Sequence, residues 1–235
     1  MIINAIIQAR MSSTRLPGKT MRSVAGRPLI QFLLERLAHC DGLDGLLIAT
    51  SDDPSDERIA EYCAQNGLPC YRGPRDDVAG RFRQATDAYP CDAFVRLCAD
   101  SPLLDPRLID RAVKVFRRRR FDVVTNVQTR TFPRGQSVEV VRCDAFRIAC
   151  DRMNEPADRE HVTRYFYRRP DEFRIRNIDS GRDWSGIRMA VDDAQSLALF
   201  EAVLGSMHRP HWQYPIEKLV ERYEEAARAM QEQHV

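Results

Sequence analysis

The residues that point most directly to chemistry lie within the first twenty positions. An apolar run over 2–9 is typical of a buried strand, and it ends abruptly at Arg10-Met-Ser-Ser-Thr-Arg-Leu-Pro-Gly-Lys19, which holds three cations and three hydroxyls. Backbone N–H groups and side-chain donors converge where such a strand leads into a loop and a helix, and this is a common way to hold phosphates. We interpret the segment as a phosphate-binding loop; the alternative is a solvated basic turn.

Lys19 stands out within this loop because the chain otherwise uses arginine. Of 36 lysines and arginines, three are lysine: Lys19, Lys114 and Lys218. An ammonium group is a compact point charge that suits phosphate oxygens, whereas a guanidinium is a planar fork. The lysine therefore supports the phosphate interpretation.

An aspartate follows a second apolar run. Residues 93–98 are predicted as a strand, and Asp100 comes just after it in Cys98-Ala-Asp-Ser-Pro-Leu-Leu-Asp-Pro106. A carboxylate that faces phosphates needs a divalent cation between them, and Mg²⁺ prefers one or two carboxylates together with phosphate oxygens and waters. Asp100 is therefore a candidate metal ligand; its alternative role is in a turn or cap. Asp105, directly before Pro106 and a helix, fits the capping role.

The segment Arg188-Met-Ala-Val-Asp-Asp-Ala-Gln195 repeats this arrangement. An apolar strand over 187–191 is predicted to end at Asp192, and Asp193 is better placed to cap the helix that follows. Two aspartates from two strand ends can hold one Mg²⁺ between them. Asp100 and Asp192 form the predicted metal pair.

The elements that must position these residues alternate along the first half of the chain. Strands are predicted over 45–50, 69–72, 93–98 and 121–127, and helices over 28–39, 55–66, 76–88 and 106–117. Such alternation favours an α/β fold with a parallel sheet covered on both faces. Ligands bind beyond the carboxyl ends of such strands, so we expect the loops 10–19, 51–54 and 99–105 to share one rim.

The second half is less regular. Strands are predicted over 137–142, 173–178 and 187–191, and helices over 143–150, 158–168, 194–204 and 215–232. No linker-like tract divides the chain, so we predict a single domain over 1–235. Its expected parts are a nucleotide-binding half over 1–127, a smaller, partly antiparallel acceptor and dimerisation subregion over 128–185, and a return strand with C-terminal helices over 186–235.

Composition excludes several classes of protein. The formal net charge is +2 with 30% charged residues, which argues against a general nucleic-acid binder. The basic run Arg117–Arg120 ends a predicted helix, where cations complement the helix dipole. We find no signal peptide and no apolar stretch of membrane-spanning length, so we expect a cytoplasmic protein. Seven cysteines and five scattered histidines show no zinc spacing, and we interpret the cysteines as buried structural thiols.

The segment from Ile7 to Lys19 resembles the N-terminal signature of the cytidylyltransferases that activate acidic sugars, namely the 3-deoxy-manno-octulosonate (KDO) and N-acylneuraminate enzymes. The overall pattern is most similar to the branch of the spore coat polysaccharide biosynthesis protein F. Further matching motifs follow in the expected order, at Asp76–Phe82, Arg96–Pro106, Phe132–Val140, Arg159–Thr163 and Val191–Asp193.

The resemblance implies a Rossmann-like nucleotide-diphospho-sugar transferase fold and a reaction in which an acceptor oxygen attacks the α-phosphorus of CTP and pyrophosphate leaves. It implies that Asp100 and Asp192 hold Mg²⁺ and that Arg10, Lys19 and Asp100 are catalytic. The residues that it implies for nucleotide binding are Ala9, Arg10, Ser12, Ser13, Arg15, Lys19, Arg81 and Asp100. Nucleotidyl transfer depends mainly on positioning and charge neutralisation, which agrees with this set.

The sequence departs from the sugar-acid enzymes beside both aspartates. Cys-Ala-Asp stands where those enzymes carry patterns such as Gln-Gly-Asp, and Asp-Ala-Gln stands where many relatives have Thr-Pro-Glu. Both changes keep the candidate metal carboxylates and alter the substrate side.

Three further residues have two interpretations each. Glu139, on a predicted strand, is either an edge-strand charge or an acceptor-binding residue. Glu160 and His161, just inside a predicted helix, either bind the acceptor or assist proton transfer, or are a first-turn glutamate and a packing histidine.

The leading hypothesis is a Mg²⁺-dependent cytidylyltransferase that joins CMP to an acidic sugar or related acid for surface glycan synthesis. One alternative is a glycosyltransferase of the same fold, although the Asp-x-Asp motif usual there is missing around Asp100. Another is a non-catalytic nucleotide-binding relative. We also expect a homodimer that pairs through the second half, with Phe132 and Pro133 as an exposed apolar arm.

Overall fold

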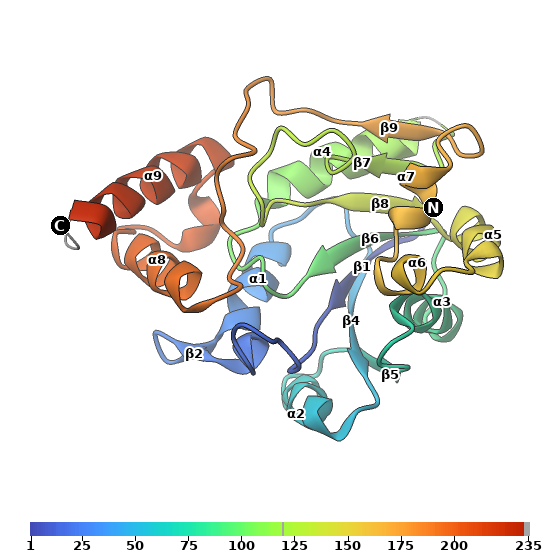
Figure 1. Cartoon of the computed structure of the whole chain (residues 1–235), viewed down its shortest axis with the longest axis horizontal. Coiled ribbons are helices and arrows are strands. Elements are labelled where there is room, and N and C mark those ends of the chain that lie inside the picture. The colour runs from blue at the N-terminus through green and yellow to red at the C-terminus, as the bar shows by residue number, and fades with distance from the viewer. Residues whose placement is uncertain (119, 233–235) are drawn as a thin grey trace.

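The computed structural model describes residues 1–118 and 120–232, and within them the central element is a seven-stranded sheet (Figure 1). The strand order is β5-β4-β1-β6-β8-β7-β9. The strands are β1 (Ile3–Gln8), β4 (Gly45–Ser51), β5 (Cys70–Gly73), β6 (Ala93–Cys98), β7 (Val123–Thr125), β8 (Glu139–Arg142) and β9 (Ile175–Asn177). A small antiparallel hairpin is formed by β2 (Ser23–Val24) and β3 (Arg27–Pro28).

Four neighbouring strands of the sheet, β5, β4, β1 and β6, pair in parallel. β1 pairs in parallel with both β4 and β6, so Ile7 lies opposite Ile48 on one side and Leu97 on the other. β1, β4 and β6 are mostly apolar, because both faces of a parallel sheet are covered by helices. β8 is antiparallel to both β6 and β7, whereas the other four pairs of neighbouring strands in this sheet are parallel. The predicted mostly parallel α/β sheet is therefore confirmed.

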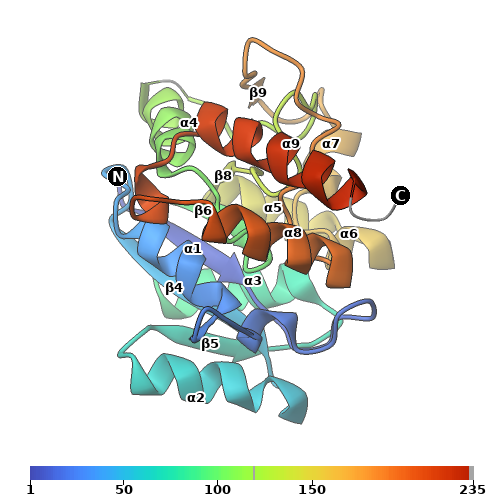
Figure 2. The same ribbon diagram turned by 90° about the vertical axis from the view of Figure 1, so that its left-hand side faces the viewer.

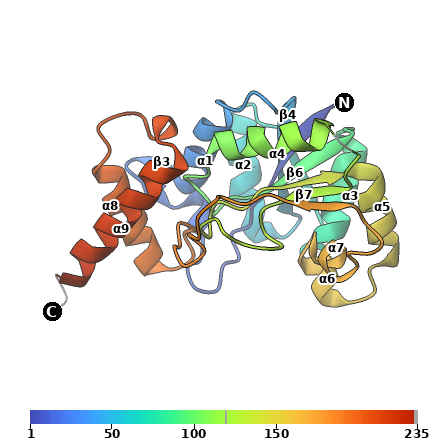
Figure 3. The ribbon, with the colours of Figure 1, turned by 90° about the horizontal axis from the view of Figure 1, so that it is seen from above.

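Helices cover the two faces of the sheet, and Figure 3 shows α4 on one side of the strands and α6 and α7 on the other. The helices are α1 (Leu29–Leu37), α2 (Glu57–Gln65), α3 (Val78–Ala88), α4 (Pro106–Arg118), α5 (Cys143–Arg152), α6 (Pro156–Glu160), α7 (Arg164–Arg168), α8 (Ala194–Gly205) and α9 (Ile216–Glu232). One core contains buried side chains of α1, α2, α4, α8 and α9, and the other contains those of α3, α5 and α7. The first core includes Ile3, Val140 and Tyr223, so all three predicted parts of the chain contribute to it.

The carboxyl ends of β1, β4 and β6 lie at one rim, because the three strands run in the same direction. The expectation that the loops after these strands share a rim is therefore confirmed. Figure 2, a view from the left-hand side of Figure 1, shows α8 and α9 nearest the viewer, beside this rim.

Asp105 connects the starts of two helices. One carboxylate oxygen accepts a hydrogen bond from the Arg107 N–H at 3.0 Å, and the other accepts from the Ile216 N–H at 2.8 Å. Its predicted capping role is confirmed, and it extends to α9 as well as α4.

Three predictions of local structure are wrong. Residues 187–191 do not form a strand; they make only an isolated bridge between Arg134 and Arg188, because the segment contacts the loop at 134 rather than a sheet edge. The helix predicted over 158–168 is two short helices, α6 and α7, interrupted at His161. Phe132 and Pro133 are buried rather than exposed, and Phe132 packs in the same core as Leu219.

The remaining expectations concern the surface and the thiols. Arg117 and Arg118 do end α4, while residue 119 lies outside the described residues. Cys63, Cys143 and Cys150 are buried as expected. The other four cysteines are only partly buried. None of the described helices combines the length and the apolar character needed to cross a membrane.

Candidate functional site

The side chain of Lys19 lies between the two aspartates predicted as metal ligands. Its Nζ is 2.8 Å from Asp100 Oδ2 and 2.8 Å from Asp192 Oδ1, and it also donates to the Val191 carbonyl oxygen at 2.9 Å. Three segments that are distant in the sequence thus meet at one ammonium group.

The loop that carries Lys19 turns back on itself at Gly18. The Gly18 N–H donates to the Met11 carbonyl oxygen at 2.9 Å, and Gly18 has φ of 71°, a left-handed conformation that glycine adopts at little cost. The Met11 N–H donates in turn to Asp56 Oδ1 at 2.6 Å, and Asp56 is buried. The loop after β1 is therefore attached to the segment after β4.

Backbone bonds place the two aspartates side by side. Asp100 follows the end of β6, where the Ala99 N–H donates to the Gln8 carbonyl oxygen at 3.0 Å. The Val191 N–H donates to the carbonyl oxygen of Asp100 at 2.8 Å, so Asp192 is held next to it. Asp193, the next residue, caps α8 through a capping box with Ser196, as predicted.

Cations dominate the electrostatics of this cluster. Asp192 is also paired with Arg188 at 2.6 Å and with Arg15 at 3.5 Å. Burial alone would lower the pKa of Lys19, but Asp100 and Asp192 together raise it above its usual value. Burial alone would raise the pKa of Asp192, but Lys19 and Arg188 lower it. Lys19 and Asp192 are therefore both charged at neutral pH.

A cavity of about 210 Å³ opens over the loop. It is lined by Gln8, Arg10, Ser13, Thr14, Arg15, Lys19, Thr20, Cys98, Ala99, Asp100 and Asp192. We call it the loop cavity. It brings together the cations, hydroxyls and carboxylates that the sequence singled out.

A second cavity of about 310 Å³ adjoins the first and shares Cys98 and Asp100 with it. It is lined by Arg96, Cys98, Asp100, Ser101, Arg130, Arg134, Gly135, Ser137, Glu139 and Ala190. We call it the arginine cavity. Because it shares Asp100 with the loop cavity, a molecule in one lies next to a molecule in the other.

Glu139 forms part of the arginine cavity, and its interpretation as an edge-strand charge is wrong. It is 1% exposed, and β8 is an interior strand of the sheet. Its Oε2 accepts from Arg96 at 2.7 Å, and its Oε1 accepts from Thr163 at 2.6 Å and from the Tyr167 hydroxyl. Burial and the neighbouring Glu139 hold the pKa of Tyr167 well above its usual value, so the phenol stays a donor.

Glu160 is the last residue of α6 and His161 follows it, so the interpretation of Glu160 as a first-turn glutamate is wrong. The interpretation of His161 as a packing histidine is also wrong, because the residue is exposed. Glu160 is 3.7 Å from Arg10, which brings it to the edge of the loop cavity. The His161 imidazole is exposed and makes no hydrogen bond with another described residue.

Three of the residues expected to bind nucleotide do not line the loop cavity. Ala9 is buried, and Ser12 is half-buried. Arg81 is 1% exposed on α3, where it donates to the Pro74 carbonyl oxygen at 2.9 Å. Its Nε and Nη2 have no partner among the described residues. The role of Arg81 stays a prediction.

The sequence interpretation missed several residues that line these cavities. Arg96 is the one charged residue of the apolar strand β6, Gln8 is the last residue of β1, and Arg96 donates to Gln8 Oε1 at 3.1 Å. A charged residue within an otherwise apolar strand was the signal that could have identified Arg96. Cys98, treated as a structural thiol, lines both cavities, and burial raises its pKa to about 11, so it is a neutral thiol.

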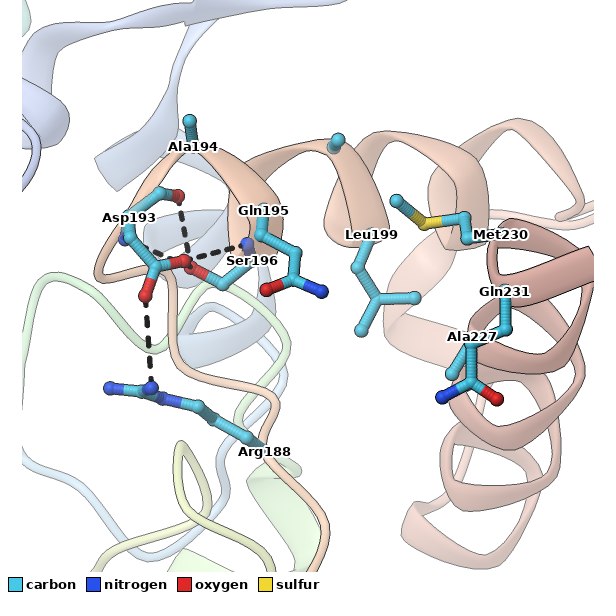
Figure 4. Close-up of a pocket in the computed structure, with 10 residues that line it drawn as sticks. Arg188, Asp193, Ala194, Gln195, Ser196, Leu199, Ala227, Met230 and Gln231 are labelled. Atoms are coloured by element: carbon cyan, nitrogen blue, oxygen red, sulfur yellow. Dashed lines mark hydrogen bonds and ion pairs between the residues drawn. The ribbon is translucent and has the colours of Figure 1, made fainter. Parts of the chain in front are cut away.

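A larger apolar groove of about 930 Å³ lies between α8 and α9, outside the ion cluster. Figure 4 shows Leu199 of α8 facing Ala227 and Met230 of α9, and Arg188 pointing to Asp193 at one end of the groove. Apart from that end, its lining lacks the charged groups that phosphate chemistry requires.

The site carries two carboxylates rather than a complete metal cage. Among the described residues, no group of three or more His, Cys, Asp or Glu side chains is arranged to hold a metal ion. Asp100 and Asp192 nevertheless converge on one cation, the Lys19 ammonium.

Comparison with known proteins decides the family. A family model described as cytidylyltransferase matches residues 4–227, which is most of the chain. The chain belongs to the cytidylyltransferase family. It is therefore a nucleotidyltransferase, and the resemblance seen in the sequence is confirmed.

Two relatives align with most of this cytidylyltransferase. The spore coat polysaccharide biosynthesis protein SpsF of Bacillus subtilis is 32% identical over 206 residues, which cover 84% of each chain. An uncharacterised protein of Methanocaldococcus jannaschii is 35% identical over 202 residues, which cover 85% of this chain and 82% of the relative. A 3-deoxy-manno-octulosonate cytidylyltransferase of Pelobacter propionicus is 34% identical over 116 residues, 48% of this chain and 44% of its own.

Solved structures share the fold. A cytidylyltransferase from Leptospira borgpetersenii superposes with a TM-score of 0.91 at 26% identity, covering 97% of this chain and 96% of the other. A CMP:2-keto-3-deoxy-manno-octonic acid synthetase complexed with CTP superposes with a TM-score of 0.68 at 18% identity, covering 87% and 99%. At that identity the second match shows the common fold alone.

Proposed function

We propose that this cytidylyltransferase transfers CMP from CTP to an acidic sugar, releases pyrophosphate and requires Mg²⁺. The observation that carries the proposal is the ion cluster of Lys19, Asp100 and Asp192, where the loop cavity meets the arginine cavity. Two relatives support it, since one is a spore coat polysaccharide biosynthesis protein and another is a 3-deoxy-manno-octulosonate cytidylyltransferase.

The donor set fits a magnesium ion. Asp100 Oδ2 and Asp192 Oδ1 are each 2.8 Å from the same nitrogen, so the two carboxylates can share one cation. Mg²⁺ is usually held by one or two carboxylates, with substrate phosphates and waters completing its octahedron. Asp100 and Asp192 would hold the ion, which when bound neutralises charge on the reacting phosphate.

The cations of the loop bind the triphosphate in this proposal. Arg10, Arg15 and Lys19 line the loop cavity with the hydroxyl of Ser13. Lys19 is charged at neutral pH because the aspartates raise its pKa. Preorganised cations of this kind stabilise the charge that develops on the leaving pyrophosphate.

The acceptor binds in the arginine cavity, beside the α-phosphorus. A hydroxyl oxygen of the acceptor forms a bond to the α-phosphorus while the bond between that phosphorus and the bridging oxygen of the β-phosphate breaks. The acceptor hydroxyl gives up its proton to solvent water, and pyrophosphate leaves with the bonding electrons. The Cys98 thiol is a poor base for this proton because it is neutral until its pKa of about 11.

Pyrophosphate release tests the proposal. The protein is mixed with CTP, Mg²⁺ and a panel of sugar acids that includes 3-deoxy-manno-octulosonate and N-acetylneuraminate. We expect pyrophosphate and a CMP-linked acid with at least one acid, and neither product when the metal is chelated. The proposal is wrong if no acid yields pyrophosphate, or if a nucleotide sugar is consumed with transfer of its sugar, as in a glycosyltransferase.

A further inference from the structure

Two arginines of the arginine cavity have no acidic partner among the described residues. Arg130 donates only to neutral oxygens, the Ser137 hydroxyl at 3.1 Å and the Pro133 carbonyl at 3.5 Å. The Arg134 guanidinium, at the exposed rim, makes no hydrogen bond or ion pair with another described residue. These side chains contrast with most arginines near the site, which are paired with carboxylates.

The other charges that line this cavity are already matched. Arg96 is paired with Glu139 at 2.7 Å, and both oxygens of that carboxylate are occupied. Asp100 is paired with Lys19 at 2.8 Å. The two remaining guanidinium groups therefore leave the cavity with an excess of positive charge.

Burial makes this excess of positive charge unfavourable. Burial lowers the pKa of Arg130, and the neighbouring Arg134 lowers it further; the nearby Glu139, which is paired with Arg96, opposes this shift only in part. A half-buried guanidinium next to another cation is stabilised when an anion comes between them, and two guanidinium forks match the oxygens of a carboxylate or phosphate.

The backbone of Arg134 is fixed relative to the ion cluster. Its N–H donates to the Ile187 carbonyl oxygen at 3.0 Å, and its carbonyl oxygen accepts from the Met189 N–H at 2.7 Å. Gly135 has φ of 98°, and a Cβ there would lie 2.5 Å from the Ala190 backbone nitrogen. The backbone of Arg134 is therefore held against the segment that precedes Asp192, while its guanidinium group has no partner among the described residues.

We propose that Arg130 and Arg134 hold an anionic group of the acceptor and make the enzyme select acidic acceptors over neutral ones. This inference rests on the proposed function and adds the residues that set acceptor specificity. Arg96 and Glu139 form the neutral wall of the same subsite, so the selection depends on the two unpaired arginines.

Equilibrium binding tests the selection without relying on turnover. The acids of the panel, their primary amides and matching sugar phosphates are titrated into the protein with Mg²⁺ and a CTP analogue that cannot release pyrophosphate. We expect the wild-type protein to bind an acid more tightly than its amide, while the phosphate arm shows whether the subsite prefers a carboxylate or a phosphate.

Substitutions then assign the selection to residues. Arg130→Gln and Arg134→Gln should each weaken binding of the acid about 10- to 100-fold, as expected for losing a hydrogen bond to a charged group. Binding of the amide and of the CTP analogue should not change, and Arg130→Lys should restore part of the preference. Arg58→Gln, an exposed arginine on α2, is the matched control.

The outcomes separate this inference from the proposed function. The inference is overturned if the wild-type protein binds no anionic acceptor more tightly than its amide, or if the two Gln variants keep the full preference. Pyrophosphate release with those acids would still support the proposed function. The reverse result, selective binding of acids that is lost in the variants but no pyrophosphate with CTP, would support the inference and overturn the transferase reaction.

Discussion

The backbone N–H of Val191 donates a hydrogen bond of 2.8 Å to the carbonyl oxygen of Asp100. This bond joins the loop after β6 to the segment before α8, and each segment carries one carboxylate of the ion cluster. The two carboxylates lie together because the backbone holds them there, and not only because Lys19 attracts both. Preorganisation of this kind is what a shared cation site requires.

Both carboxylates of the cluster should be needed for turnover. We expect Asp100→Asn and Asp192→Asn each to lower turnover several hundred-fold or more, since losing a group that stabilises transition-state charge typically costs roughly 3–4 kcal/mol. Stability should change little. Steady-state pyrophosphate release across a Mg²⁺ titration is the measurement.

Asp193→Asn is the control for this experiment, because Asp193 is adjacent in sequence and asparagine also caps helices well. It should keep near-normal turnover. A near-normal, Mg²⁺-dependent rate in Asp100→Asn or Asp192→Asn would show that the substituted aspartate is not a metal ligand.

CTP binding should depend on the compact ammonium group of Lys19 and not only on its positive charge. We expect Lys19→Ala to weaken CTP binding and turnover, and Lys19→Arg to restore them only in part, because a planar fork does not reproduce the compact point charge that phosphate oxygens would contact. Calorimetry of CTP binding checks this, with Lys218→Arg, an exposed lysine of α9, as the control. Full activity of Lys19→Arg would contradict the prediction.

The sequence predicted the parts of the site that depend on local pattern. Asp100 is recognisable because an apolar strand ends just before it, and Lys19 because its loop concentrates cations and hydroxyls. In a parallel sheet the carboxyl ends of such strands meet at one edge, so their proximity followed from the fold class.

Long-range contacts could not be predicted in the same way. The segment 187–191 has the apolar pattern of a strand, yet it makes only one isolated bridge, to the loop at Arg134. Glu139 could be interpreted from the sequence as an edge-strand charge. Its hydrogen-bond partners Thr163 and Tyr167 lie more than 20 residues away in the sequence, so the local pattern around Glu139 does not reveal them. One sequence carries no signal for such pairings.

Gly135 should be required for the close approach of its loop to the segment before Asp192. An alanine at 135 would place its Cβ 2.5 Å from the Ala190 nitrogen and 2.7 Å from the Met189 carbonyl carbon. We expect Gly135→Ala to lower both the melting temperature and turnover, because the segment must move.

Gly181→Ala separates the steric effect from the backbone effect. Gly181 also has a positive φ, 73°, but a Cβ there would meet nothing within 4 Å. Both variants should lose about 1–2 kcal/mol for the left-handed conformation, and Gly135→Ala should lose more. Equal losses of stability and normal turnover in both would contradict the proposed close contact.

Asp193 should stabilise α8 in a pH-dependent way. Hydrogen bonds from Ser196 lower the pKa of Asp193 below its usual value of 3.8. The stabilisation is therefore fully present above that value and is lost as the pH falls through the lower pKa of the folded state. At neutral pH, Asp193→Ala should cost about 1 kcal/mol of unfolding free energy.

Urea denaturation at neutral and acidic pH measures this contribution. The difference between wild type and Asp193→Ala should shrink as the carboxyl becomes protonated in the folded state. Asp76→Ala is the control, because the Asp76 side chain is 99% exposed and should contribute almost nothing at either pH. A difference that stays constant into acid would show that the cap does not depend on the charge of Asp193.

The protein should form a homodimer in solution. The sequence-based reason for this expectation, an exposed arm at Phe132 and Pro133, is removed because both residues are buried. The expectation now rests on the resemblance to the sugar-acid cytidylyltransferases and on fold-level analogy. The second half also contains β9, which among the described residues is an edge strand paired with β7 alone, and a free strand edge is a ready surface for pairing. Light scattering at micromolar concentration should give a mass near twice 27.1 kDa, whereas a mass near 27.1 kDa that does not rise with concentration would establish a monomer.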